Sequence, residues 1–150
     1  MKALSLYQPW ASFCVTPRKD DPSKPVKMDE TRSWRPPTHI ILPVRIAIHA
    51  SARTPKEDRE YWEDDRLMWE HLGVKRVQDL PMGCLLGTVL LTGYSPTNHV
   101  KPDSISEALG NYGPNRFAWH IREPKPFATP IPCKGSLGLW EVPEGLIYDA

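Results

Sequence analysis

The sequence predicts a β-dominated α+β fold, a small barrel of five or six strands with one long and two short peripheral helices. Three observations predict it. Short apolar segments rich in β-branched residues recur along the chain, and signals for helices occur in only three places. The 17 prolines are scattered and tend to lie at the ends of apolar segments. At 150 residues, we expect a single domain that spans positions 1–150.

The first third of the chain predicts a strand, a short helix, a loop and a second extended segment. Residues 2–7 are typical of a strand, and residues 9–15 of a short helix because Pro9 suits a first helical turn. A polar loop interrupted by proline follows over 17–25, and residues 27–34 should be extended.

The middle of the chain predicts a buried strand and the long helix. Residues 44–50 are mostly apolar and β-branched. Thr54 to Glu57 combines a capping box with proline at the first helical position, and Gly73 supplies the C-terminal stop. Within this helix, two sets of side chains share faces at helical spacings, and we interpret them as core anchors more readily than as a ligand platform. They are Tyr61, Met68 and Leu72 on one face, and Trp62 and Trp69 on the other.

The remaining elements are three strands and a short helix. Residues 84–92 are strongly apolar, and 116–121 and 138–142 also resemble strands. A helix opens at Ser104 and ends at Gly110.

The charge distribution favours an anionic ligand in the first third of the chain. The net charge of +1 argues against a protein that holds long duplexes by charge alone. Residues 1–56 carry ten Lys and Arg against four Asp and Glu, whereas residues 57–70 carry seven acids against two bases. The alternative is that both blocks are solvated faces.

Cysteine usage and hydropathy predict a cytoplasmic protein without a membrane span. The three cysteines are widely spaced and odd in number, which favours reduced thiols. The histidines show no metal-ligand spacing, so the sequence predicts no metal and no cofactor.

The candidate site is centred on Lys27, Glu30 and Arg32. Side chains alternate along a strand, so Glu30 and Arg32 share one face, and Lys27 joins them only if the chain bends or is still a loop there. With Trp10 and Trp34 nearby, a converging trio suits a planar polar ligand such as a nucleobase or nucleotide. The alternatives are an internal ion-pair network for the trio and a place in the core for either indole.

Each member of the trio has a distinct chemistry. In a dry cleft Lys27 is a candidate base or nucleophile, and when exposed it is a phosphate contact. Glu30 is a candidate acid/base group or an acceptor for the amino group of a base, and Arg32 offers a planar fork for phosphate or a carbonyl edge.

Further candidates come from the end of one strand and from a turn. His49 and Ser51 lie where the buried strand ends; His49 is either an acid/base group or a structural histidine. Tyr112 and Arg116 flank a tight turn, which would place one for stacking and the other for a phosphate.

Six short motifs occur in order along nearly the whole chain: Leu4 to Ser12, Lys27 to Trp34, Ile46 to Ser51, Leu86 to Val89, Tyr112 to Trp119, and Pro130 to Gly135 with Gly138 to Trp140. Together they resemble the motifs of the ASCH family, relatives of the PUA domain. The resemblance implies a PUA-like β-barrel, a cleft beside the first helix, and an association with RNA or modified nucleosides.

Two features depart from the family's pattern. The Pro17–Pro25 loop separates the first helix from the Lys-x-x-Glu-x-Arg motif, and Pro43-Val44-Arg45 replaces an Arg-Gly pair. Some relatives look like amidohydrolases that use a lysine with a threonine three positions later, but here that position is Glu30 and Thr31 comes one later, on the opposite face of a strand.

The leading functional hypothesis is a cleft that binds short or single-stranded RNA, or a modified nucleoside or nucleotide. A second hypothesis is a hydrolase of the ribonuclease or amidohydrolase type, with Lys27 and Glu30 as acid/base groups and His49 assisting. A third, also drawn from the family, is a protein-interaction adaptor.

Overall fold

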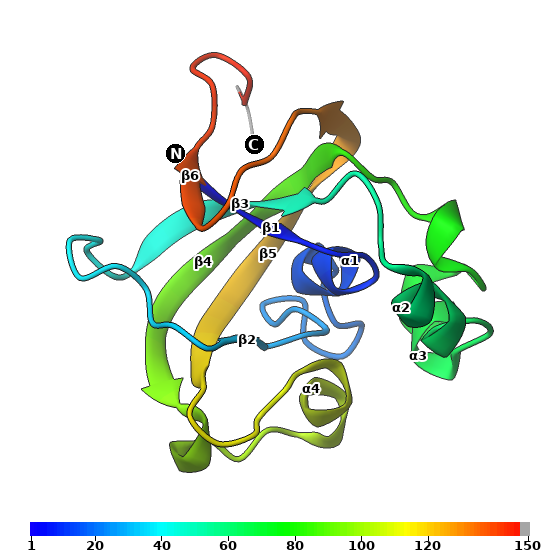
Figure 1. The fold of residues 1–150 in the computed structure, drawn as a ribbon, viewed down its shortest axis with the longest axis horizontal. Coiled ribbons are helices and arrows are strands. Elements are labelled where there is room, and N and C mark those ends of the chain that lie inside the picture. Colours follow the sequence, from blue (N-terminus) through cyan, green and yellow to red (C-terminus); the bar gives the residue numbers. More distant parts are fainter. Residues whose placement is uncertain (148–150) are drawn as a thin grey trace.

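The chain forms one strongly curled sheet of six strands in the order β2-β5-β4-β3-β1-β6, as Figure 1 shows. The structure is a computed structural model, and it describes residues 1–147. Strands β1 and β3 are parallel, and the other neighbours are antiparallel. The strands are β1 (Lys2–Leu6), β2 (Asp29–Arg32), β3 (Val44–Ala50), β4 (Cys84–Pro96), β5 (Phe117–Pro132) and β6 (Leu139–Glu141).

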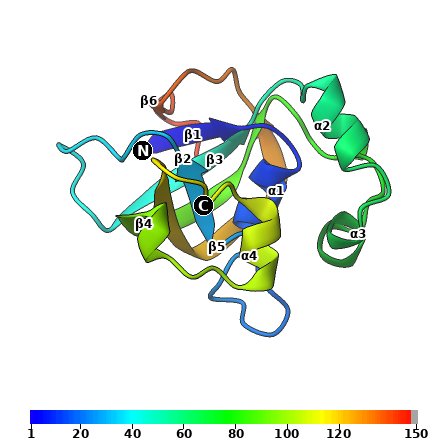
Figure 2. The same cartoon turned by 60° about the horizontal axis from the view of Figure 1, so that its bottom comes forward.

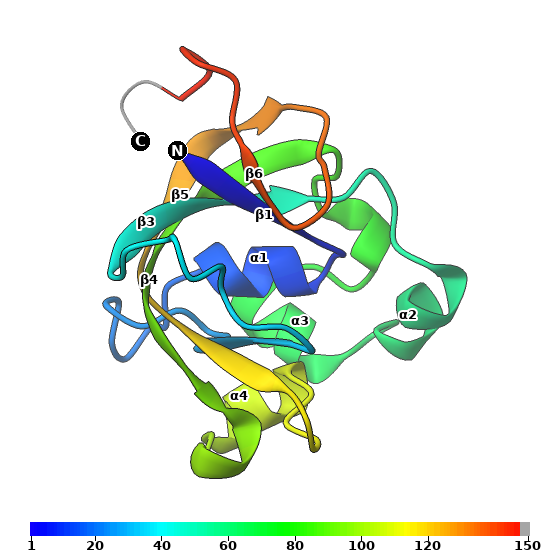
Figure 3. The same cartoon turned by 60° about the vertical axis from the view of Figure 1, so that its left-hand side comes forward.

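Helix α1 (Trp10–Val15) lies inside the curve of the sheet, which Figure 3 shows most clearly. Five of its six residues are buried, because a helix in this position contacts apolar side chains on almost every side. Its Ala11, Cys14 and Val15 pack with inward residues of β1, β3, β4 and β5 in the main core. The predicted β-dominated α+β fold, a small barrel of five or six strands, is therefore confirmed in the form of a curled six-stranded half-barrel.

A second apolar cluster joins α1 to the helices that cover the open side of the sheet. Phe13 packs there with Trp62, Met68 and Leu109. The helices are α2 (Lys56–Tyr61), α3 (Arg66–Leu72) and α4 (Ser104–Leu109), with short 3-10 turns η1 (Val77–Asp79) and η2 (Thr97–His99).

The prediction of one long helix after Thr54 is wrong, because α2 and α3 are separate. The chain takes a left-handed conformation at Asp64 (φ 55°), and Asp65 then caps α3 by accepting a hydrogen bond from the Leu67 amide. Thr54 does not cap α2; its hydroxyl donates to the carbonyl of Gln8 at 2.9 Å. Gly73 ends α3 as predicted, at φ 70°.

The break between α2 and α3 also changes which aromatic side chains are buried. Trp62 and Met68 are core residues as predicted, but Tyr61 is 74% exposed and Trp69 is 57% exposed. A continuous helix would keep residues at helical spacings on one face, whereas the turn at Asp64 reorients α3 relative to α2. The prediction of Tyr61 and Trp69 as core anchors is therefore wrong.

Strands β4 and β5 are longer than the sequence predicts and form the back of the half-barrel (Figure 1). Strand β5 continues through prolines that, from the sequence, were expected to lie in the segment connecting two strands. The β4–β5 ladder shifts register at three points, and two of these shifts contain prolines of β5, which need not donate a hydrogen bond there. At one of them the strands approach so closely that a Cβ on Gly87 would lie 2.5 Å from the carbonyl oxygen of Lys125.

The Pro17–Pro25 loop is held by a buried arginine. Figure 2 shows the loop beside α4. The Arg18 guanidinium donates to the carbonyl oxygens of Pro25 and Val26, each at 3.0 Å, and to both carboxylate oxygens of Asp103 and the hydroxyl of Ser106 at the start of α4. The loop is thus attached to a helix that lies 85 residues further along the chain.

The ion pair of Arg18 and Asp103 predicts a stability change at acidic pH. Hydrogen bonds from Arg18, together with those from Ser106, lower the pKa of Asp103 from 3.8 to about 2. Because the folded pKa lies below the unfolded one, this stabilisation is complete above pH 3.8 and is lost as pH falls toward 2. The difference in melting temperature between the natural chain and Asp103→Asn should therefore shrink as the pH falls from 3.8 toward 2. A difference that does not change with pH would contradict this prediction.

None of the helices in residues 1–147 combines the length and hydropathy that crossing a bilayer requires.

Candidate functional site

The edge strand β2 presents neighbouring carboxylates to opposite sides of the sheet. Among the strands of residues 1–147 it pairs only with β5, and Glu30 lies opposite Trp119 in the ladder. Since side chains alternate along a strand, Glu30 and Arg32 point into the hollow of the half-barrel, and Asp29 points the other way. Lys27 precedes the strand, so its side chain is free of this alternation.

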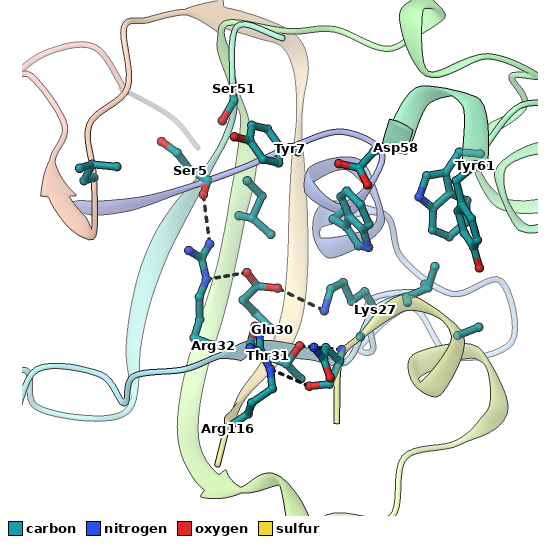
Figure 4. A pocket seen from close by; sticks show the side chains of 18 of the residues that line it. Ser5, Tyr7, Lys27, Glu30, Thr31, Arg32, Ser51, Asp58, Tyr61 and Arg116 are labelled. Carbon is teal, nitrogen blue, oxygen red and sulfur yellow. Dashed lines mark hydrogen bonds and ion pairs between the residues drawn. The ribbon is translucent and has the colours of Figure 1, made fainter. Parts of the chain in front are cut away.

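The three charged residues converge as the sequence analysis required. Lys27 Nζ lies 3.2 Å from Glu30 Oε1, and Arg32 Nε lies 2.8 Å from Glu30 Oε2. Lys27 Nζ also donates to the backbone carbonyl of Asp29, and Arg32 Nη2 donates to the carbonyl of Ser5 at 3.0 Å. Figure 4 shows Glu30 between the two cations. The bend before β2 therefore brings Lys27 to the Glu30 face.

The trio is both an ion-pair network and part of the wall of a cleft. Lys27 is 1% exposed, whereas the Arg32 side chain retains 24% exposure. The cleft has a volume of about 740 Å³, within the range of roughly 300–1,000 Å³ usual for ligand sites. Its lining comes from Ser5, Leu6, Tyr7 and Trp10; Lys27, Glu30, Thr31 and Arg32; Ser51; Asp58, Tyr61 and Trp62; residues 108–111 with Arg116; and residues 136–138.

Six of the residues predicted for the site line this cleft. Trp10 packs against Trp62 with perpendicular rings 5.9 Å apart, so part of its indole belongs to the second apolar cluster. Arg116 is oriented by the carbonyls of Asn111 and Thr31, each at 3.0 Å. The six are Trp10, Lys27, Glu30, Arg32, Ser51 and Arg116.

Two predicted aromatic contacts lie elsewhere. Trp34 packs edge-on against Trp119, at 4.7 Å between ring centroids, and stands 5.9 Å from the Arg32 guanidinium. Tyr112 donates its hydroxyl to Asp29 Oδ2 at 2.8 Å, on the outer side of β2. Neither residue is among those that line the cleft.

His49 is also placed outside the cleft. It is 2% exposed, and its ring nitrogens lie 3.0 Å from the Ser5 hydroxyl and 2.7 Å from the Cys133 carbonyl. The carbonyl of Ser5 accepts a hydrogen bond from Arg32 in the wall of the cleft (Figure 4). The hydroxyl of Ser5 lies against His49. These contacts fit the structural histidine that the sequence left as an alternative.

Two tyrosines that the sequence analysis did not assign to the site lie at the cleft. Tyr7 is 48% exposed and Tyr61 is 74% exposed, and Asp58 from α2 lies between them in Figure 4. The sequence signals for Tyr7 are its place in the motif Leu4 to Ser12 and in the strand-to-helix connection, where side chains often serve function. Tyr61 was hidden because its spacing matches that of a core residue.

The electrostatics of the cleft favour a ligand with both anionic and donor groups. Lys27, Arg32 and Arg116 oppose Glu30 and Asp58, so the lining carries one net positive charge. Beneath the trio, burial raises the pKa of the Cys14 thiol to about 12. A protonated buried thiol is a poor nucleophile, so Cys14 acts as a core residue.

The fold of the chain is similar to that of a solved structure, although its sequence matches no family model. No protein-family model and no curated protein matches the chain. The fold is similar to the crystal structure of a mutant of ZmASCH from Zymomonas mobilis, at 18% identity and a TM-score of 0.46, over 87% of this chain and 74% of that chain. That neighbour is an ASCH protein, the family that the motifs resemble.

Proposed function

We propose that this chain is an ASCH-type domain whose cleft binds short or single-stranded RNA, or a modified nucleoside or nucleotide. The observation that carries the proposal is the convergence of Lys27, Glu30 and Arg32 in the wall of a cleft of about 740 Å³ with exposed tyrosines at its opening.

The lining supplies the contacts that a nucleotide requires. The planes of Tyr7 and Tyr61 offer stacking surfaces, and each stacked base contributes roughly 1–3 kcal/mol. The partly exposed guanidinium of Arg32 suits a phosphate or a base carbonyl. Glu30 and Asp58 are acceptors for the exocyclic amino groups of a base.

The same features favour single strands over duplexes. Unpaired bases expose both their faces and their hydrogen-bonding edges, and proteins recognise them by stacking in clefts. A duplex is held mainly by many phosphate contacts, and this lining has one net positive charge. We therefore expect binding with a weak dependence on salt.

Fluorescence anisotropy with a labelled single-stranded RNA of about one OB-fold site size, roughly 4–16 nucleotides, tests the proposal. If each tyrosine stacks on one base, Tyr7→Ala and Tyr61→Ala should each raise Kd by roughly 5- to 150-fold. Tyr94→Ala is the matched control, because Tyr94 is also exposed but lies on β4 outside the cleft lining. Equal affinity for all four proteins, or no binding to RNA, nucleotides or nucleosides, would refute the proposal.

The hydrolase hypothesis has less support from the geometry. Lys27 is 1% exposed and forms an ion pair with Glu30 at 3.2 Å, so its ammonium group is held in the wall of the cleft by a structural contact. His49, the assisting residue of that hypothesis, hydrogen-bonds to Ser5 and Cys133 away from the cleft lining. Binding without turnover is therefore the function that we propose.

A further inference from the structure

A second constellation lies on the outer side of β2 and comprises Ser95, His120 and Asp29. Asp29 is 4% exposed, and its Oδ1 lies 2.6 Å from His120 Nδ1. The other ring nitrogen, Nε2, lies 2.9 Å from the Ser95 hydroxyl. Ser95 and His120 are both half-buried, so reagents in solvent can approach them. None of the three lines the cleft described above.

The hydrogen bonds dictate which atoms carry protons. Burial alone would raise the pKa of Asp29, but hydrogen bonds from His120 and Tyr112 bring the pKa below its ordinary value. The carboxylate is therefore ionised at neutral pH and can only accept, so His120 Nδ1 is the donor. In neutral imidazole, Nε2 is then an acceptor, and the Ser95 hydroxyl must donate to it.

This arrangement resembles the general-base activation of a serine nucleophile. The hydroxyl points its proton at a basic nitrogen, and a buried carboxylate orients the ring and stabilises the imidazolium that forms when the proton moves. Tyr112 fixes the carboxylate from the other side, with its hydroxyl 2.8 Å from Asp29 Oδ2. His120 on β5 and Tyr112 both contact Asp29 on β2, and Ser95 on β4 contacts His120 on the neighbouring strand β5. The pairing of the three strands thus holds the serine, the histidine and the aspartate in place.

We propose that Ser95 is a nucleophile that accepts an acyl group from activated esters, with His120 as its general base and Asp29 as the residue that positions His120. The Ser95 oxygen bonds to the acyl carbon as its proton passes to His120 Nε2. The bond between the acyl carbon and the leaving oxygen then breaks, and the proton goes to that oxygen. The products are acyl-Ser95 and the free alcohol or phenol.

The chain contains a second serine–histidine pair, Ser5 and His49, with which the pair of Ser95 and His120 can be compared. Ser5 also hydrogen-bonds to a histidine, at 3.0 Å from His49 Nδ1, but the other nitrogen of His49 faces the Cys133 carbonyl instead of a carboxylate. A neutral carbonyl stabilises an imidazolium less than a carboxylate does, and His49 is almost fully buried. Ser5 is therefore expected to stay unreactive where Ser95 reacts.

Labelling with a fluorophosphonate probe, followed by peptide mass spectrometry, tests the proposal. The serine oxygen displaces fluoride from phosphorus, so the mass of the probe without fluorine marks the site. We expect the label on Ser95 and not on Ser5 or the exposed Ser23. Ser95→Ala should abolish labelling, and His120→Gln should slow it by about 100-fold or more, the usual contribution of a general base.

Two further readouts separate activation from a structural role. An aryl acetate should release its phenol in an initial burst with the natural chain and not with Ser95→Ala, while RNA binding in the cleft and the melting temperature stay the same. The labelled residue is identified on the natural chain, without any variant. The test can therefore be decided even if Ser95→Ala or His120→Gln fails to fold. Labelling spread over several serines, labelling unchanged in His120→Gln, or no labelling would each overturn the proposal.

Discussion

Replacing Glu30 by glutamine is expected to lower the free energy of unfolding by about 3–5 kcal/mol, the usual cost of leaving a buried charge without its partner. Lys27 is 1% exposed, and Glu30 Oε1, 3.2 Å away, is its counter-charge. The same substitution leaves Arg32, which is 2.8 Å from Glu30 Oε2, as a second cation beside an uncharged amide. Both effects act in the folded state alone.

Urea unfolding of Glu30→Gln and of a matched control measures this loss. Glu70→Gln is the control, because Glu70 pairs with Arg66 at 2.5 Å on the surface of α3, where an exposed pair contributes about 0–1 kcal/mol. The double variant Lys27→Met with Glu30→Gln should recover part of the loss, since it removes the unpaired ammonium as well. Equal losses for Glu30→Gln and Glu70→Gln would mean that the trio is solvated.

The second large effect is expected for Arg18→Met. Arg18 is 9% exposed and holds the carbonyl oxygens of Pro25 and Val26. Methionine keeps much of the apolar stem of arginine but cannot donate a hydrogen bond. Each buried carbonyl that loses its donor should lower the free energy of unfolding by about 1–3 kcal/mol. Val26 directly precedes Lys27, so the same change loosens the bend that brings Lys27 to Glu30.

Chemical denaturation measures the loss of stability, and limited proteolysis measures the loosening of the loop. Denaturation should show the lower stability, and proteolysis should show faster cleavage within residues 17–25. Lys24→Met is the control: it removes a cation of the same loop, but Lys24 is exposed and pairs with Asp21 at 3.7 Å. If Lys24→Met had the larger effect, Arg18 would not be the residue that holds the loop.

The arrangement of the charged trio could be predicted in part from the sequence. Strand alternation correctly places Glu30 and Arg32 on one face, because the period of two follows from backbone geometry alone. The position of Lys27 depends on a bend whose supports are distant in sequence, such as Asp103 and Ser106 on α4. No local pattern around residue 27 contains that information.

The aromatic residues show a different limit of sequence patterns. Tyr61 and Trp62 are neighbours with similar hydropathy, yet one is 74% exposed and the other 3%. Trp62 is buried by Trp10 and Phe13 of α1, which are distant in sequence, so no local pattern around residue 62 contains this information. The contacts of Trp34 and His49 likewise depend on partners from other strands, Trp119 and Ser5.

The outer constellation was hidden for the same reason. Asp29, Ser95 and His120 are spread over three strands, and only the pairing of β2 and β4 with β5 brings them together. Glu30 was predicted for the site, and its neighbour Asp29 was not. Alternation implies that adjacent carboxylates on an edge strand serve different faces, and this signal was present in the sequence.

The most direct test of the cleft is a titration of the ¹⁵N-labelled protein with a short single-stranded RNA, followed through the indole N–H signals of its six tryptophans. The signals of Trp10 and Trp62, which line the cleft, should shift in proportion to bound ligand. Those of Trp69 and Trp140, outside the lining, should stay in place. Shifts confined to Trp69 or Trp140, or no shift at saturating RNA, would contradict an RNA site built on Lys27, Glu30 and Arg32.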